Sequence, residues 1–231
     1  MDVNRLVEIL KKVNKGEIAE KNALKKIKEA SPLDLTMAEE KILIDGLDDR
    51  HLQKFCRTHL DAIEEKMEDV KVQLSDQHPL FKLVEEHEKI IETVDNLDYL
   101  AGIMEDRDLD LEEIETLEIS VDNLGEKESH HEREEELIFP EIKKKKINLS
   151  VEDLEKDHEE ITPKVERLKE FIEEPNEYKQ EILDLIYDLS FNIRRHVFQE
   201  NVILYPAVLN AVEDWDAIAA ESEKIGYCTF K

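Results

Sequence analysis

Apolar residues recur along this chain in steps of three and four, the spacing that lines one buried face of an α-helix. The pattern predicts helices almost throughout. Because proline lacks the backbone N–H, a kink or local break is expected at Pro140, Pro163 and Pro206, which fall inside helical patterns. The expected helices cover about residues 6–14, 18–30, 36–46, 48–72, 76–104, 109–145, 150–173, 177–212 and 215–224.

Polar residues enter the apolar stripes of the four helices that follow residue 76. Each stripe carries a histidine, and on two helices a glutamate follows the histidine by four residues. Residues four apart share one helix face, with Cβ atoms about 5–6 Å apart, so such a pair can hold one metal ion from a single helix. The candidate metal ligands are His87, His130, Glu134, His158, His196 and Glu200.

These candidates belong to two copies of one pattern. Residues 130–140 recur as residues 196–206, and both copies read His-x-x-x-Glu, two residues, two aliphatics, an aromatic and proline. A shorter phrase at 86–90, which contains the first histidine, recurs at 157–161. A duplicated half-site predicts a symmetric site with two similar metal positions.

A plainer interpretation is that the histidines are satisfied core residues and the glutamates are solvated. With 59 acidic residues among 231, a glutamate four positions after a histidine is common. Two pairs with matching flanks and two further core histidines favour the metal, because unpaired buried carboxylates and imidazoles lose on the order of several kcal/mol of hydration each. Four imidazoles and two carboxylates without a thiolate suit iron, manganese or zinc.

Two carboxylates shared between two metals suggest that Glu134 and Glu200 bridge them. If both metals are six-coordinate irons with an oxo or hydroxo bridge, about ten of their twelve positions are filled. About one position on each iron then stays open for O2, NO or peroxide. The predicted cofactor is therefore a pair of iron ions, and the predicted partner is a small diatomic molecule or peroxide.

The motif set resembles the hemerythrin-like, or HHE cation-binding, domains over about residues 76–213. The resemblance implies an up-down four-helix bundle around a di-iron centre, with histidines as terminal ligands and glutamates as bridges. Five-histidine hemerythrins carry O2 and have a further histidine where this chain has Thr162, and an aspartate where it offers Glu200. The four-histidine set instead resembles di-iron proteins that repair iron–sulfur clusters after nitrosative or oxidative stress.

The flanks resemble a prokaryotic family that joins such a bundle to a helical domain of unknown function 438. Residues 42–46, 52–59 and 215–228 carry this likeness. Cys56 and His59 form a Cys-x-x-His pair, for which helix packing is the plainer interpretation. The predicted divisions are a small helical domain at 1–74, the bundle at 76–213, and a short helix with a tail at 214–231.

The formal net charge of −27 argues against nucleic acid as a partner, because phosphate would be repelled. No apolar run approaches the ~20 residues of a membrane span, and the N-terminus lacks the apolar core of a signal peptide. Two cysteines, Cys56 and Cys228, offer no disulfide framework. We therefore expect a cytoplasmic protein without membrane insertion.

Polar residues near the candidate ligands receive plainer interpretations. His131 is rotated by about 100° from its neighbour and is expected at the surface or beside the ligands. Glu132 and Glu135 are candidates for extra ligands or for groups that support the ligands. His78 lies about 13 Å along the helix from His87, so we expect it to end the helix without joining the metal.

Two functions remain open at this point. The first is a non-haem di-iron protein that reacts with O2, NO or peroxide in the response to oxidative or nitrosative stress. The alternative is a signalling module, in which the bundle senses O2 or iron and the N-terminal domain transmits to a protein partner or a homodimer. A ferritin-like oxidase fits poorly, because its site uses Glu-x-x-His on two helices and here only Glu155 with His158 offers it on a core-facing histidine.

Overall fold

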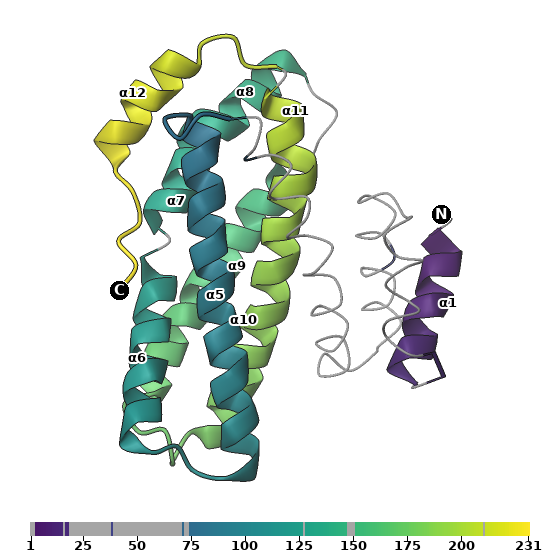
Figure 1. Cartoon of the computed structure of the whole chain (residues 1–231), viewed down its shortest axis with the longest axis vertical. Helices are drawn as coiled ribbons and strands as arrows, with labels where there is room; N and C mark the ends of the chain where they lie inside the picture. Colours follow the sequence, from purple (N-terminus) through teal and green to yellow (C-terminus); the bar gives the residue numbers. More distant parts are fainter. Residues whose placement is uncertain are drawn as a thin grey trace.

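The computed structural model describes residues 3–15, 17–18, 38, 71, 74–126, 128–146, 151–209 and 211–231. The first expected helix is found as α1, Val3–Asn14. The helices expected within 18–72, together with Cys56 and His59, lie outside the described residues apart from residues 18, 38 and 71. The described part of the chain forms helices without a strand, which confirms the predicted all-α class (Figure 1).

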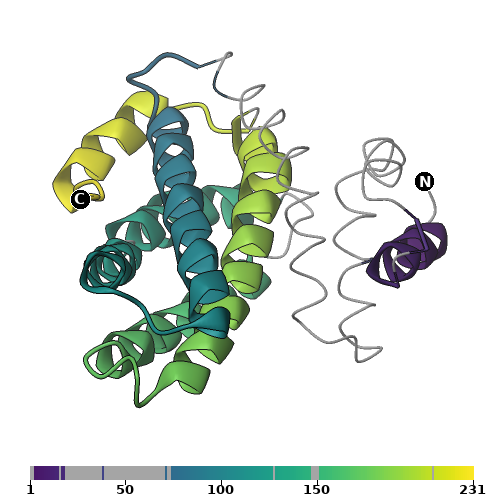
Figure 2. The ribbon, with the colours of Figure 1, turned by 60° about the horizontal axis from the view of Figure 1, so that its bottom comes forward.

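Four columns of helix stand side by side as a bundle (Figures 1 and 2). The first and third columns each pack against the second and fourth, so the four close into a ring. Short connections turn the chain back after each long helix, which gives the up-down order. The columns are α5 (Pro79–Asp106); α6 (Leu111–Gly125), α7 (Glu128–Arg133), η1 (Glu134–Ile138) and α8 (Phe139–Lys145); α9 (Glu152–Phe171); and α10 (Lys179–Gln199), η2 (Glu200–Leu204) and α11 (Tyr205–Leu209).

Side chains at the helix starts satisfy backbone N–H groups that have no partner within the helix. His78, which was expected at an end of the helix, caps the start of α5 by accepting a hydrogen bond from the N–H of Leu80 at 3.2 Å. Pro79 follows at the first helical position, where its missing N–H costs nothing. At the start of α6, Asp110 and Glu113 form a reciprocal capping box with bonds of 3.0 and 2.9 Å.

Two of the three internal prolines follow a local widening of the helix. The segments η1 and η2 are π-helical, and in each the N–H of the aromatic residue bonds to the carbonyl of the glutamate five residues earlier. Pro140 and Pro206 come directly after these aromatic residues. At these two positions the expected disturbance is therefore a π-turn. By contrast, α9 runs through Pro163 without interruption, so no break is found there.

The interior of the bundle is apolar above and below its centre. Leu80, Leu97, Leu117 and Ile186 are at most 1% exposed, and each such side chain stabilises the fold by roughly 1.5–3 kcal/mol. This packing holds the four columns in register around the polar residues at mid-height. Among the described helices, none combines the length and hydropathy needed to span a bilayer.

The last helix, α12 (Trp215–Ile225), packs against α5, α7 and η1. It ends at Gly226, whose positive φ of 99° suits a residue without a side chain. The helix expected at 215–224 is thereby confirmed. Beyond it, residues 227–231 return along the bundle (Figure 1), where the N–H of Lys231 donates to Asn123 at 2.8 Å and the hydroxyl of Thr229 donates to Glu126 at 2.9 Å.

Candidate metal centre

All six histidines and glutamates singled out from the sequence meet inside the bundle, and each is at most 4% exposed. They form two overlapping groups of four, in which the ligand atoms lie within 4.8 Å of one another. Both groups contain the same two carboxylates. The histidines divide into a first half-site, His87 and His130, and a second half-site, His158 and His196, with Glu134 and Glu200 common to both.

Glu200 turns one carboxylate oxygen toward each half-site. Its Oε2 lies 3.1 Å from Nε2 of His87, and its Oε1 lies 3.1 Å from Nε2 of His196. Neither oxygen has a hydrogen-bond partner, although the side chain is fully buried. A buried carboxylate placed in this way suits a bridge between two cations.

Glu134 also faces both half-sites, but through one oxygen. Its Oε2 lies 3.5 Å from Nε2 of His130 and 3.5 Å from Nε2 of His158, again without a hydrogen bond. Its Oε1 accepts a hydrogen bond of 2.6 Å from the hydroxyl of Tyr205. The two shared carboxylates are therefore held differently.

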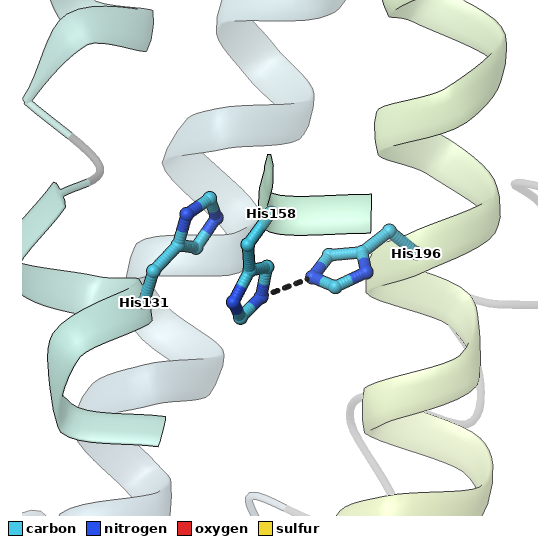
Figure 3. A group of neighbouring side chains, drawn as sticks. All are labelled: His131, His158 and His196. Atoms are coloured by element: carbon cyan, nitrogen blue, oxygen red, sulfur yellow. Dashed lines mark hydrogen bonds between the residues drawn. The ribbon is translucent and has the colours of Figure 1, made fainter. Parts of the chain in front are cut away.

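The atoms that face the middle of the centre are mostly unsatisfied. Nε2 of His87 and Nε2 of His130 are buried without a hydrogen-bond partner, and such atoms cost about 1–3 kcal/mol each. In the second half-site, Nε2 of His158 and Nε2 of His196 face each other at 2.9 Å (Figure 3). Imidazole nitrogens that converge on carboxylate oxygens left without hydrogen bonds fit a cation, and this set of ligand atoms suits a transition metal.

Comparison with known families agrees with this geometry. Residues 78–208 match the hemerythrin HHE cation binding domain. The chain belongs to this family. Residues 6–69 match a family of unknown function, DUF438, so the architecture predicted from the sequence is confirmed. A comparison with curated proteins finds no match to the chain.

In the HHE domain of this chain, His130 is supported from behind by a buried carboxylate. Its Nδ1 donates to Glu86 at 2.8 Å, and Arg133 donates to the same carboxylate at 2.6 Å. The backbone N–H of Cys228 in the tail adds a third donor at 3.0 Å. Burial raises the pKa of Glu86, but the bond from His130 and the charge of Arg133 outweigh it and lower the pKa to about 2. Because this carboxylate stays ionised and only accepts, the proton of His130 is fixed on Nδ1 and Nε2 is left as a ligand.

The second half-site has carboxylates behind both rings. Nδ1 of His158 donates to Glu135 at 2.6 Å. Nδ1 of His196 lies 3.4 Å from Asp157, which Arg195 holds through a bond of 2.6 Å. Glu135, one of the two glutamates considered as extra ligands or supporting groups, thus stands behind a histidine. Its neighbour Glu132 is exposed.

An amide stands behind the remaining ring. Nδ1 of His87 lies 2.7 Å from the side-chain nitrogen of Asn201, which also donates to the carbonyl of Val197 at 2.9 Å. Asn201 directly follows Glu200, as Glu135 directly follows Glu134. The position of these two supporting residues is therefore duplicated, whereas the residue type differs, an amide in one copy and a carboxylate in the other.

Sequence reasoning missed most of these supporting residues, although a signal was present. An acidic residue precedes the histidine in both copies of the short phrase, as Glu86 and as Asp157. Each of them reaches across to the histidine of the next column, His130 or His196, and not to its own neighbour. A repeated carboxylate directly before a repeated core histidine is thus a usable signal for a residue that supports a ligand.

Burial and mutual charge set the protonation of the central groups. Burial and the negative charge of Glu200 raise the pKa of Glu134 well above its usual range. Burial lowers the pKa of His196, but the charge of Glu200 outweighs it and raises the pKa to about 10. In the protein without metal, protons on Glu134 and His196 therefore offset negative charge that bound cations would otherwise neutralise. Burial lowers the pKa of His130 to about 4, which keeps this imidazole neutral, the form that binds a metal.

Proposed function

We propose that this chain holds two iron ions in the HHE domain and reacts through them with O2, NO or peroxide during oxidative or nitrosative stress. The observation that carries the proposal is the pair of overlapping four-residue groups that share Glu134 and Glu200. His87, His130, His158 and His196 would be terminal ligands, and the two glutamates would bridge. Bound iron would supply the one-electron redox chemistry that side chains lack.

The protein's own contribution is to hold the imidazoles in fixed orientations within a dry interior. Carboxylates behind His130 and His158 keep the proton on Nδ1 and direct Nε2 toward the centre. Buried apolar side chains stand one turn away on the same helices, including Leu83, Leu154 and Ile193. They exclude water, so a small uncharged molecule can approach the centre more readily than an ion can.

Tyr205 places a proton beside the shared carboxylate. Burial and the charge of Glu134 raise its pKa well above the usual range, so the hydroxyl stays protonated and donates to Glu134 Oε1. Its ring also stacks on His87, with centroids 5.5 Å apart and planes within 6°. The side chain can therefore orient Glu134 and hold a proton in the hydrogen bond between the two oxygens, which are 2.6 Å apart.

A second function is favoured by the presence of two families on one chain. The matched segment at 6–69 is separate in sequence from the HHE domain at 78–208. In this alternative the bundle senses O2 or iron, and the N-terminal part transmits to a protein partner or a second copy. Both proposals divide the chain at 1–74, 76–213 and 214–231 and place it in the cytoplasm.

Anaerobic iron loading followed by stopped-flow mixing tests the proposal. The full chain should bind two irons, and it should show an iron-dependent charge-transfer spectrum after oxidation. One tightly bound metal, or zinc alone with no such spectrum after anaerobic iron loading, would contradict the paired centre. Catalytic turnover of O2, NO or peroxide supports the stress-response function, whereas stoichiometric and reversible binding supports the sensor.

A further inference from the structure

The tail, residues 227–231, lies outside both families that the chain matches, since those matches cover residues 6–69 and 78–208. It follows α12 and runs beside α7 toward the end of α6 (Figure 1). Any effect of this segment on the metal centre is therefore an addition to the matched HHE domain.

The beginning of the tail meets the residues that stand behind His130. The backbone N–H of Cys228 donates to Oε1 of Glu86 at 3.0 Å. The guanidinium of Arg133 lies over the ring of Tyr227, 4.8 Å from its centroid, which suits a cation–π contact. Glu86 and Arg133 are only 7% and 2% exposed. With the tail in place, neither member of this ion pair can turn to water, and Glu86 stays directed at His130.

Few contacts fasten the ends of the tail. At the far end, the N–H of Lys231 donates to Asn123 at 2.8 Å, and the amide nitrogen of Asn123 donates to a backbone oxygen of Lys231 at 3.3 Å. Between the ends, Phe230 packs against the apolar core. At the near end stands Gly226, with its φ of 99°, and among the described residues no atom lies within 4 Å of where its side chain would begin. A residue with this freedom can act as a hinge.

A groove of about 440 Å³ lies between the tail and α5. Tyr227, Cys228 and Phe230 line it on the side of the tail, and Glu86 lines it on the side of the helix. The groove is lined further by charged residues of α5, namely Lys82, Glu85, Glu88 and Lys89. Because the groove already reaches Glu86, lifting the tail would expose this carboxylate to water without moving a helix of the bundle.

We propose that the tail is a hinged strap that positions Glu86 against His130 and so sets how firmly the first half-site holds its metal, an inference that rests on the proposed di-iron centre. When the tail swings away about Gly226, Glu86 loses a backbone donor and gains water, and its hold on His130 weakens. The second half-site is supported by Glu135 and Asp157 instead. Opening of the tail therefore changes one metal position and leaves the other as it was.

Cys228→Pro and Cys228→Ala, each made in the full chain, form a matched pair. Both lose the thiol, but only proline lacks the backbone N–H that Glu86 accepts. Titration with cobalt(II) in the absence of O2 measures the two binding steps. The wild-type chain and Cys228→Ala should bind two ions with the same two affinities. Cys228→Pro should bind one ion as the wild type does and the other about tenfold more weakly.

A second variant releases the tail from its far end. Asn123→Ala removes the partner of Lys231, and Asn123 belongs to α6, whereas the six candidate ligands belong to other helices. In the metal-free chain, this change should speed hydrogen exchange at the backbone N–H of Cys228, read by mass spectrometry. In the titration, it should weaken the same cobalt ion that Cys228→Pro weakens.

The outcomes separate the tail from the centre. Two unchanged affinities in both Cys228→Pro and Asn123→Ala, or an equal loss at both ions, would overturn the strap and leave the paired centre standing. Fewer than two cobalt ions in the wild-type chain would overturn the paired centre and the role of the strap with it. If Cys228→Pro fails to fold, Asn123→Ala decides between these outcomes.

Discussion

The two half-sites come from two copies of one motif, yet the carboxylates behind their histidines differ in how deeply they are buried. Behind the first, Glu86 is 7% exposed and accepts from a histidine, an arginine and the backbone of the tail. Behind the second, the side chain of Glu135 is 43% exposed and that of Asp157 is 13% exposed. The duplication preserved the six candidate ligands, whereas the residues that hold them diverged. The difference teaches that equal ligands need not make equal metal positions.

The aromatic residues that follow the two π-turns repeat this contrast. Tyr205 stacks on His87, and Phe139 takes the equivalent place near His158 with ring centroids 5.9 Å apart. The packing is alike, but only the tyrosine has a hydroxyl, and it donates to Glu134. The first half-site thus carries a proton donor that the second lacks.

Removing a shared carboxylate should have the largest effect, because it acts on both half-sites at once. Glu200→Gln keeps the shape of the side chain but replaces the oxygens that face His87 and His196 with a neutral amide. We expect loss of both irons after anaerobic loading, measured by elemental analysis, with the helical circular dichroism retained. Glu159→Gln, at an exposed position beside His158, is the control and should keep both metals. Two irons in Glu200→Gln would show that this carboxylate is not shared.

Removing the support behind each half-site should separate the two. Glu86→Gln leaves the buried Arg133 without its charge partner, and such a loss costs about 3–5 kcal/mol. Asp157→Asn should cost less, because its partner Arg195 has a side chain that is 19% exposed and can turn to water. We expect metal affinity to fall about 100-fold for the first change and about tenfold for the second. Anaerobic metal titration and urea unfolding measure both effects, and equal losses would contradict the comparison.

Replacing Tyr205 with Phe makes the two half-sites alike at this position. The change leaves Glu134 Oε1 buried without its donor, which should lower the free energy of unfolding of the metal-free protein by about 1–3 kcal/mol. Urea unfolding measures it. Phe139→Tyr is the reciprocal variant, and it should not restore the loss when added to Tyr205→Phe, because it lies near the other half-site. An unchanged unfolding midpoint in Tyr205→Phe would show that the hydroxyl bond contributes nothing.

The thiol of the tail gives the smallest predicted effect, and it concerns the first half-site alone. Burial and the charge of Glu86 raise the pKa of Cys228 to about 11, which favours the protonated thiol. In a Cys56→Ser chain, roughly 0.1% of this thiol is ionised at pH 8. Alkylation, followed by mass spectrometry, should therefore be slow at pH 8 and should accelerate as the pH approaches 11. Unfolding in urea should restore the alkylation rate of an ordinary cysteine at pH 8. Equal rates in the folded and unfolded chains would contradict the raised pKa of Cys228 beside Glu86.

The positions of the candidate ligands could be predicted from the sequence because they depend on local rules. A spacing of four residues on an apolar stripe fixes which way His196 and Glu200 point, and the second copy of the motif confirms the pattern. The end of α12 was predictable for the same reason, since the helix expected to about residue 224 ends at Ile225, whereas α5, expected from about residue 76, begins at Pro79.

The supporting contacts could not be predicted in the same way, because they join different columns. Glu86 and His130 are 44 positions apart, and nothing local to either residue shows that the two meet. The tail is a stronger case, since Cys228 reaches Glu86 across 142 positions. The π-turns were expected only as kinks or breaks, because a proline shows that the hydrogen-bond pattern changes but not how it changes.

The two π-turns also bear on which insertions and deletions the chain can accept. A π-turn holds one residue more than an α-helical turn, and here each begins at a shared carboxylate, Glu134 or Glu200. In a regular helix, Phe139 would lie about 140° around the axis from Glu134, whereas the wider turn brings it close to the same face. Deletion of one residue inside η1 would leave a regular helix in which the aromatic residue follows the glutamate by four positions, so the segment after it would nearly keep its direction. A search for related sequences should therefore keep the spacing from histidine to glutamate fixed and should allow one residue fewer between the glutamate and the aromatic–proline pair.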